Sequence, residues 1–320
     1  MAISSVLGSS ALAPAGLGFR NKIINGGFDI WQRGTSFSSA GYTADRWAVV
    51  AASGQTVSVT QQAFTPGNAI TGQEPSFFTR IAWSGTPSGT FWFTQRVEDV
   101  RTCAGQPAVL SFWAKASSST SVFVPTIEQN FGTGGSSVVT TTSSAITLTT
   151  SWQRFVVSFN VPSISGKTIG TNSFLDVRPL NGGSTVNGIN IDIWGVQFEQ
   201  NVMPTPFEQR PIGVELSLCH RYYQRMVDPA GAGVSSGGGT VARTLLPLYT
   251  KMRVAPTSTI SGTLNFWNGG SAATCTSIQT VFNSVSQGQI DFACSVGSLG
   301  QAIMLYTTGG SQYLDFSAEL

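Results

Sequence analysis

Residues 187–210 contain an alternating segment that runs into two prolines. From Ile189 onward, apolar side chains alternate with polar or aromatic ones, which is the period of a strand with two different faces. Pro204 and Pro206 follow, and a proline cannot donate a hydrogen bond to a sheet ladder. The segment therefore predicts the closing strand of a first domain, with a separate unit after Arg210.

Similar strand-length segments recur before this point. Segments 77–83, 90–97, 108–114 and 154–161 are separated by Gly, Ser, Thr and Pro turns. Roughly ten such strands precede residue 210, which predicts a two-sheet sandwich in which each sheet buries one face. Only 10% of the 320 residues are charged and 36 are glycine, a composition that favours short strands over long surface helices.

The same composition excludes several functions. A net charge of +2 argues against a nucleic-acid partner, because such proteins concentrate excess Lys and Arg on one face. The sequence has no run of eighteen apolar residues, so we expect no membrane insertion. Low charge also indicates that part of the surface is buried against other chains.

Residues 211–228 predict a helical connector. Val214, Leu218, Tyr222 and Met226 recur at every fourth position, which places them on one face of a helix over 212–226. This apolar stripe packs either on the sheet of the first domain or on other copies of the chain. Strand-length segments then return, so residues 229–320 predict a smaller C-terminal β-sandwich.

The first 22 residues are small and almost uncharged, and they cannot form a core alone. They are either a disordered tail or a docking arm that orders against a larger assembly, and we favour the arm. Four scattered cysteines and a single histidine, His220, make a zinc site unfavourable. Cys275 and Cys294 can face each other on neighbouring strands, but we expect buried free thiols.

Several motifs resemble those of known families. The opening 24–29 (INGGFD), with 110–115 (LSFWAK) and 151–155 (SWQRF), resembles jelly-roll carbohydrate-binding modules. Together with 42–47 (YTADRW) and 206–210 (PFEQR), the set resembles bacteriophage tail-fibre and receptor-binding proteins. The resemblance covers residues 23 to about 226 well and the last ninety more loosely.

The resemblance implies an all-β chain with an N-terminal docking arm (1–22) and a jelly-roll domain (23–210) ahead of the connector and the C-terminal sandwich. It further implies a virion protein, assembled in the bacterial cytoplasm, that binds host surface polysaccharide as a homotrimer. Residues 1–22 would join it to other virion proteins. The main alternative is a capsid decoration or head-fibre protein that needs no ligand.

Acidic residues give little support for catalysis. Glycoside cleavage needs two carboxylates beside the sugar bond, and Glu98–Asp99 is the only adjacent acidic pair. Local ion pairing at a strand end explains this pair, so we expect no enzyme and no catalytic residue. In carbohydrate-binding modules, acids such as Asp29 and Asp192 often hold structural calcium. Two acids are few for that ion, so strand-end salt bridges to Arg33 or Arg46 are the favoured role.

Exposed aromatic rings are the other candidate chemistry, because the C–H face of a sugar stacks on them. The resemblance assigns Trp47, Trp113 and Trp152 to buried positions. The candidate carbohydrate-binding residues are Trp83, at a strand end, Trp92, opposite Phe91 and Phe93, and Trp267, on a turn. The candidate oligomer contacts are Leu218 and Tyr222.

Overall fold

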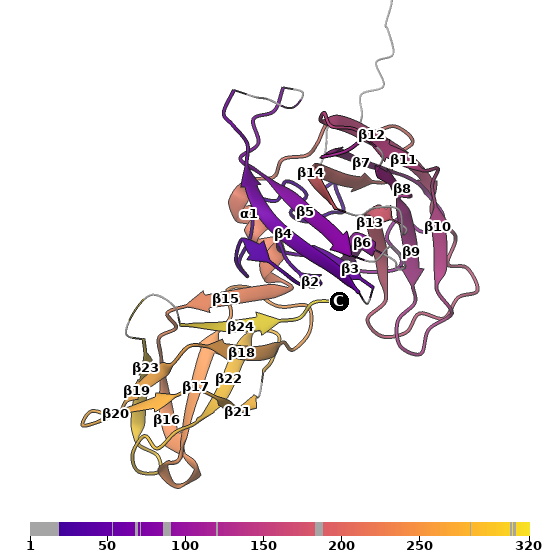
Figure 1. Cartoon of the computed structure of the whole chain (residues 1–320). Coiled ribbons are helices and arrows are strands. Elements are labelled where there is room, and N and C mark those ends of the chain that lie inside the picture. Colours follow the sequence, from indigo (N-terminus) through magenta and orange to yellow (C-terminus); the bar gives the residue numbers. More distant parts are fainter. Residues whose placement is uncertain are drawn as a thin grey trace, which may run out of the picture.

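The computed structural model describes residues 19–320, apart from positions 53, 68–69, 71, 86–90, 120, 183–187, 282, 308 and 310–311. The described chain is almost entirely β, with two sandwiches joined by one short helix (Figure 1). Most of the predicted docking arm, up to residue 18, lies outside the described residues. No helix in the described part is long and apolar enough to cross a bilayer.

The first domain contains two six-stranded antiparallel sheets and a small two-stranded sheet. Their orders are β1-β4-β5-β14-β7-β12, β10-β9-β13-β6-β3-β2 and β11-β8. The bounds are β1 Ser36–Phe37, β2 Gly41–Tyr42, β3 Ala48–Ala51, β4 Gln55–Ala63, β5 Phe77–Gly85, β6 Phe91–Val97, β7 Pro107–Ala116, β8 Ser121–Phe123, β9 Thr126–Asn130, β10 Val139–Thr142, β11 Ile146–Leu148, β12 Gln153–Asn160, β13 Phe174–Gly182 and β14 Ile189–Glu199.

One apolar core fills the space between these sheets. Strand β6 shows the alternation that the sequence predicts, because Phe91 and Phe93 are buried while Trp92 points away from them and is partly exposed. Core side chains come from both sheets and pack in one cluster. Burying one face of each sheet is what stabilises an antiparallel sandwich, so the predicted jelly-roll architecture is confirmed.

The segment before β1 runs beside the second half of β14. Lys22 N donates to Phe198 O at 2.8 Å, and Val196 N donates to Gly26 O at 3.0 Å. Gly26 is required for this approach, since a Cβ there would lie 2.1 Å from the carbonyl oxygen of Val196. The chain therefore enters the fold along its closing strand.

Helix α1 spans Ile212–His220 and is shorter than predicted. The prediction of a helix over 212–226 is wrong beyond His220, because Tyr223–Val227 form strand β15. Strand β15 pairs in register with β24, Tyr223 with Ser317. A ladder with a strand ninety residues away outweighs the local helical period, which is weak evidence beside tertiary pairing.

The C-terminal domain is a second, smaller sandwich. A three-stranded sheet, β15-β24-β18, packs on a seven-stranded one, β20-β19-β23-β16-β17-β22-β21, with side chains of both in one core. The bounds are β15 Tyr223–Val227, β16 Gly231–Ser236, η1 Gly237–Gly239, β17 Val241–Pro247, β18 Thr257–Ser261, β19 Leu264–Trp267, β20 Ala272–Cys275, β21 Ile278–Val281, β22 Gln287–Ala293, β23 Ala302–Tyr306 and β24 Tyr313–Ser317.

A disulfide joins Cys275 to Cys294, whose Cα atoms are 5.5 Å apart. The expectation of free thiols is therefore wrong for this pair. Cys275 ends β20 at one edge of the larger sheet, and Cys294 follows β22 near the other edge, so the sheet curves until its edges meet. Cys103 and Cys219 are free and buried, as expected.

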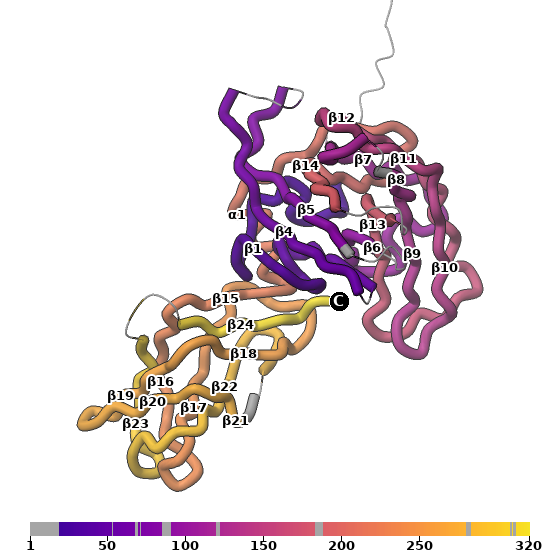
Figure 2. Tube along the Cα trace, in the orientation of Figure 1, coloured from indigo at the N-terminus to yellow at the C-terminus, as the bar shows by residue number. Residues whose placement is uncertain are grey.

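The two domains meet around a buried guanidinium. The Arg46 side chain is 1% exposed, and its charged carbon lies 3.4 Å from the ring centroid of Tyr222. Its Nη1 is paired with the carboxylate of Glu319, which follows β24. Arg33 also reaches Glu319, at 3.0 Å. Figure 2 shows the C-terminal segment after β24 ending beside the first domain.

We expect Glu319→Gln to destabilise the protein strongly. The substitution removes the carboxylate and leaves the Arg46 charge buried, a change that costs about 3–5 kcal/mol. Urea unfolding of the full chain measures this cost. Asp99→Asn is the matched control, since Asp99 pairs with Arg101 at the surface and should contribute less than about 1 kcal/mol. Equal effects of the two substitutions would contradict the assignment.

Candidate functional site

Three segments of the chain converge beside the start of α1. They are residues 21–29, the residues just before and at the start of β5, and the exit segment 207–215. Asn25 fixes the first segment, because its Nδ2 donates to Ile30 O at 2.8 Å and to Asp45 O at 3.1 Å. Its own carbonyl accepts from the indole of Trp47 at 2.9 Å. This buried amide holds the opening motif against the core.

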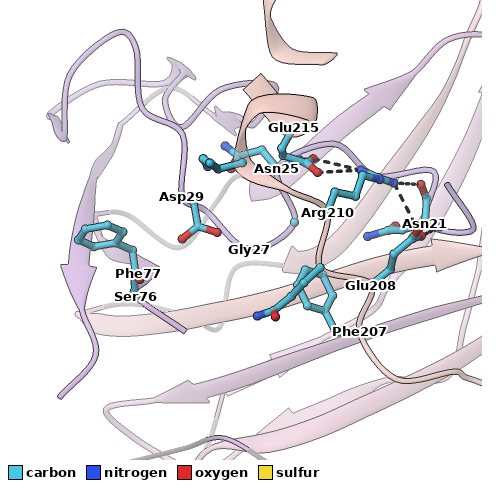
Figure 3. Close-up of a pocket in the computed structure, with 13 residues that line it drawn as sticks. Asn21, Asn25, Gly27, Asp29, Ser76, Phe77, Phe207, Glu208, Arg210 and Glu215 are labelled. Atoms are coloured by element: carbon cyan, nitrogen blue, oxygen red, sulfur yellow. Dashed lines mark hydrogen bonds and ion pairs between the residues drawn. The ribbon is translucent and has the colours of Figure 1, made fainter. Parts of the chain in front are cut away.

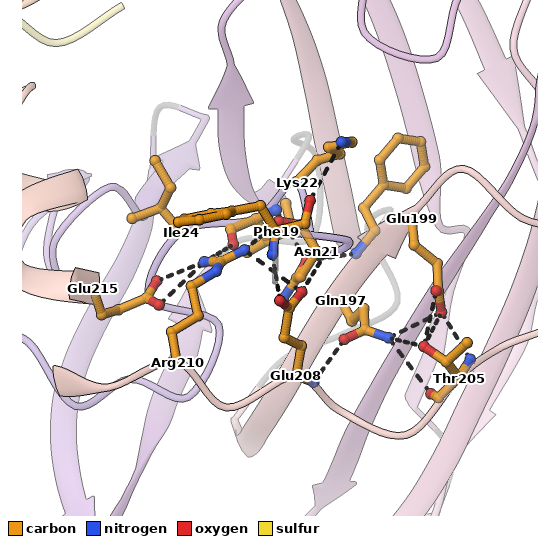
Figure 4. A network of polar contacts seen from close by, with 12 residues as sticks. Phe19, Asn21, Lys22, Ile24, Gln197, Glu199, Thr205, Glu208, Arg210 and Glu215 are labelled. Carbon is orange, nitrogen blue, oxygen red and sulfur yellow. Dashed lines mark hydrogen bonds and ion pairs between the residues drawn. The ribbon is translucent and has the colours of Figure 1, made fainter. Parts of the chain in front are cut away.

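Arg210 fixes the exit segment (Figure 4). Its Nη1 donates to Ile23 O and to both oxygens of Glu215, each at 3.1 Å. Its Nη2 donates to Asn21 O. The carboxylate of Glu208 accepts from Asn21 N at 2.7 Å. These bonds tie the beginning of the domain to its end and to the first turn of α1.

A second set of bonds, also in Figure 4, anchors the prolines that close the domain. Gln197 Nε2 donates to Glu199 and to the Thr205 hydroxyl, each at 2.9 Å, while Thr205 N donates to Glu199 at 2.8 Å. Gln197 Oε1 accepts from Glu208 N at 2.8 Å. The buried polar groups of this region thus bond to one another and form a rigid frame.

The frame encloses a pocket of about 460 Å³ (Figure 3). This volume lies within the range of small-molecule sites, which is roughly 300–1,000 Å³. The lining residues are Asn21, Asn25, Gly26, Gly27, Asp29, Ser76, Phe77, Phe207, Glu208, Gln209, Arg210, Ile212 and Glu215. The pocket therefore combines the opening and exit motifs with one loop of the first sheet.

The apolar side of the pocket consists of two rings and one aliphatic side chain. Phe207 is held by Trp194, with ring centroids 5.0 Å apart, and it faces Gly26 and Gly27. Phe77 stands across the pocket and is partly exposed. Ile212 begins α1 with 61% of its surface exposed. These groups present a hydrophobic wall to anything that enters.

Three polar side chains of the pocket are left over. Asp29, Ser76 and Gln209 make no side-chain hydrogen bond or ion pair within the part of the chain that the structure describes, whereas Glu208 and Glu215 are fully engaged. All three are exposed to solvent. Although Asp29 as a whole residue is exposed, the pocket wall partly buries its carboxyl group, and this burial, followed by the charge of Glu215, raises the pKa of Asp29 to about 6.

Of the three tryptophans predicted to bind carbohydrate, Trp83 is buried. It is 3% exposed, packs against Phe91 at 4.1 Å between centroids, and belongs to the core. The prediction of an exposed ring at this position is wrong, because the strand continues into the sheet and turns this face inward. Trp92 lies on the outer face beneath Arg178 at 4.6 Å, and Trp267 is 41% exposed.

Of the three tryptophans assigned to buried positions, one is fully buried and two are partly buried. Trp47 is fully buried and stacks on Phe93, with 4.7 Å between centroids. Trp113 and Trp152 are partly exposed instead, and Lys115 lies 5.3 Å above the Trp152 ring. Both rings pack against the core cluster, so they are partly rather than fully buried.

The structure gives the two predicted calcium ligands different surroundings. Asp192 accepts from Arg80 through both oxygens, at 2.7 and 2.8 Å, and lies 3.5 Å from Lys115. Its partners are thus neither Arg33 nor Arg46, the partners that the sequence suggested. Asp29 lines the pocket without any ion pair there. Within the described ranges, no three His, Cys, Asp or Glu side chains are placed so that they could hold one metal ion together. Calcium at Asp29 and Asp192 stays a prediction.

The predicted oligomer contacts pack within the chain. Tyr222 is 4% exposed, lies under Arg46 and donates its hydroxyl to Glu98 at 3.0 Å. It is therefore unavailable to another copy, and this part of the prediction is wrong. Leu218 faces a cavity of about 430 Å³ between α1 and the first domain. Glu98 also pairs with Arg221 at 2.9 Å, whereas its neighbour Asp99 pairs locally with Arg101.

Reasoning from the sequence missed the residues of the pocket other than Asp29. Phe77, Phe207 and Gln209 were not singled out, because phenylalanine is normally core and an isolated glutamine is not distinctive. The available signal was the position of Phe207 and Gln209 inside the exit motif 206–210. A motif that pairs with the opening of the domain indicates that the two ends meet.

No protein-family model and no curated protein matches this sequence. Solved structures match weakly. One is a two-module part of endo-1,4-beta-D-xylanase 10B of Clostridium thermocellum, complexed with xylohexaose (8% identity, TM-score 0.39, 57% of this chain and 29% of that chain). Another is the family 22 xylan-binding domain of a Paenibacillus barcinonensis protein (8%, 0.34, 54% and 90%). A third is a sugar-binding protein, so described, from Bacteroides thetaiotaomicron (12%, 0.35, 57% and 100%). At these identities the matches concern the arrangement of strands only.

We expect Asp29→Asn to stabilise the fold at neutral pH. Because the pKa of Asp29 rises from 3.8 to about 6 on folding, its contribution to stability is fully present below 3.8 and lost as the pH rises through 6. The variant has no carboxyl group there and does not lose this stability. We expect it to exceed the parent at neutral pH by no more than about 1 kcal/mol in unfolding free energy, because solvent screens the exposed carboxyl. Urea unfolding of variant and parent at pH 4 and pH 7.5 measures the difference.

Burial also raises the pKa of Asp45 to about 6, but Asp45 is present in both proteins and cancels in the comparison. An Asp29→Asn variant that is less stable than the parent at pH 7.5 would show that the carboxylate is a structural ligand. The same loss at pH 4 would point to a general packing defect.

Proposed function

We propose that this chain is a non-enzymatic glycan-binding protein and that the pocket beside Asp29 is a sugar-binding subsite. The observation that carries the proposal is the pairing of a hydrophobic wall with polar groups that the fold does not use. Phe77 and Phe207 offer the wall, and Asp29, Ser76 and Gln209 offer the free acceptors and donors. A sugar ring has the complementary surfaces, an apolar C–H face and a rim of hydroxyls.

The distribution of carboxylates supports binding rather than cleavage. Hydrolysis of a glycosidic bond needs two carboxyl groups free to act on the sugar. Glu215 is bonded to Arg210 and to Asn25 N, and Glu208 to Asn21 N, so Asp29 alone is available in the pocket. His220 packs on the Tyr249 ring at 5.1 Å, away from this pocket.

The biological setting that we propose is a bacteriophage virion. The support is the resemblance of the motifs around 24–29, 42–47 and 206–210 to tail-fibre and receptor-binding proteins. In this setting the glycan would be a host surface polysaccharide, and the segment before residue 19 would join the chain to other virion proteins, since residues 19–22 are already bonded to the first domain. A homotrimer remains part of the proposal, with exposed Val214 of α1, which lies outside the pocket lining, as a candidate contact in place of Tyr222.

We predict that Phe77→Ala weakens glycan binding about tenfold. An aromatic contact contributes roughly 0.5–1.5 kcal/mol beyond buried area, and 1.4 kcal/mol is a factor of ten. The strongest ligand of an array of bacterial surface polysaccharides would be titrated by calorimetry into the full chain. Trp92→Ala and Trp267→Ala are matched controls, each of which removes a ring outside the pocket.

Loss of affinity in either control with none in Phe77→Ala would move the site to that tryptophan. Failure of every arrayed polysaccharide to bind the parent protein would overturn glycan binding altogether.

We predict that the chain occupies phage particles at the tail and that residues 2–20 are needed for this. A small, uncharged segment without a core of its own gains order only against a partner. Electron microscopy of particles assembled with the full and the shortened chain would locate the protein. A position on the capsid would favour the decoration or head-fibre alternative, and normal incorporation of the shortened chain would contradict the docking arm.

A further inference from the structure

The charges that line the pocket do not balance. Three carboxylates, those of Asp29, Glu208 and Glu215, face a single guanidinium, that of Arg210. We propose that the subsite receives a hexosamine unit whose amino group is not acetylated, with the ammonium held by Asp29 between the rings of Phe77 and Phe207. This inference rests on the proposed function and adds the class of sugar.

The carboxylates differ in how they are used. Arg210 donates to both oxygens of Glu215 and lies 4.0 Å from Glu208, and main-chain amides of Asn21 and Asn25 complete these two acids. Asp29 has no such partner within the described part of the chain. Burial of the carboxyl in the pocket, and then the charge of Glu215, raise the pKa of Asp29, so this carboxylate lacks a counter-charge and lies near a second negative group. A cation bound beside Asp29 would supply the missing counter-charge and would reduce the repulsion between Asp29 and Glu215.

The two rings favour the same kind of ligand. Figure 3 shows the Asp29 carboxylate pointing into the space between Phe77 and the Gly27 backbone, with Phe207 on the other side. The face of an aromatic ring carries negative potential and attracts ammonium groups within about 6 Å. A carboxylate flanked by rings is thus matched to an ammonium in charge and in surface.

Other sugars fit this site less well. An acidic sugar would bring a negative charge towards Asp29 and Glu215, and like charges at close range are repulsive. A neutral sugar can donate hydroxyl hydrogen bonds to Asp29, but it brings no counter-charge, so it compensates the carboxylate less fully than an ammonium does. An N-acetylated hexosamine has the same defect, because acetylation removes the positive charge.

The remaining groups select a sugar rather than a simple amine. The Ser76 hydroxyl and the Gln209 amide are free at the rim, where ring hydroxyls of a bound sugar can reach them. Ile212 offers a further apolar contact that an isolated ammonium compound would not use. Both features lie beyond the reach of a ligand that fills only the space beside Asp29.

The test compares three tetrasaccharides by calorimetry with the full chain at pH 7, namely those of glucosamine, N-acetylglucosamine and glucose. We expect the glucosamine tetramer to bind at least about tenfold more tightly than the other two. Asp29→Asn should abolish this preference. Glu74→Gln is the matched control, since it removes an exposed acid in the same loop as Ser76 but outside the pocket, and the preference should persist.

Lowering the pH from 7 to 5 supplies a second readout. Asp29 becomes protonated over this range, so the affinity for the glucosamine tetramer should fall in the parent protein. It should not fall in Asp29→Asn, where there is no carboxylate to protonate. Equal falls in both proteins would overturn the role of Asp29.

The remaining outcomes separate this inference from the proposed function. Equal binding of all three tetrasaccharides, still weakened by Phe77→Ala, would leave glycan binding intact and overturn the ammonium site. Absence of glucosamine binding, while other arrayed glycans bind, would do the same. Displacement of the tetramer by choline as efficiently as by glucosamine itself would overturn the assignment to a sugar.

Discussion

The buried guanidinium of Arg46 is the constraint on which the relation of the two domains depends. A charge removed from water must find a counter-charge and an accommodating surface, or the fold loses several kcal/mol. Here the first domain contributes the arginine, while the second contributes the Glu319 carboxylate and the connector contributes the Tyr222 ring. Separation of the domains would break the pair between Arg46 and Glu319 and leave the Arg46 charge without its counter-charge.

Arg210, just before the connector, likewise joins segments of the chain that are distant in sequence. Arg210 holds the first turn of α1 through Glu215 and holds the entry of the chain through the carbonyls of Asn21 and Ile23. The pocket lies inside this arrangement, and its electrostatics follow from it. Glu215 is needed to anchor the helix, yet its charge also acts on Asp29 across the pocket.

Alternation in the sequence was enough to predict the class of fold, because the side chains of a strand must divide between core and solvent. It placed Trp92 correctly on an outer face. It did not predict the burial of Trp83, because the sequence at the end of an apolar segment does not show whether other strands cover that side chain. The strand at Tyr223 and the bond between Cys275 and Cys294 depend on partners distant in sequence, which no local period encodes.

The site was less predictable for a reason that the structure makes plain. Most polar residues of the opening and exit motifs are consumed by the frame, as with Asn25 and Arg210, and a motif alone cannot separate these from residues that remain free. Native folds satisfy nearly all of their buried polar groups, and departures from local consistency concentrate where a protein acts. Asp29 and Gln209 differ from their neighbours in making no side-chain hydrogen bond within the described residues, a difference that the sequence does not reveal. In the proposed site, a cationic ligand would offset the small cost, no more than about 1 kcal/mol, of the partly buried Asp29 carboxylate.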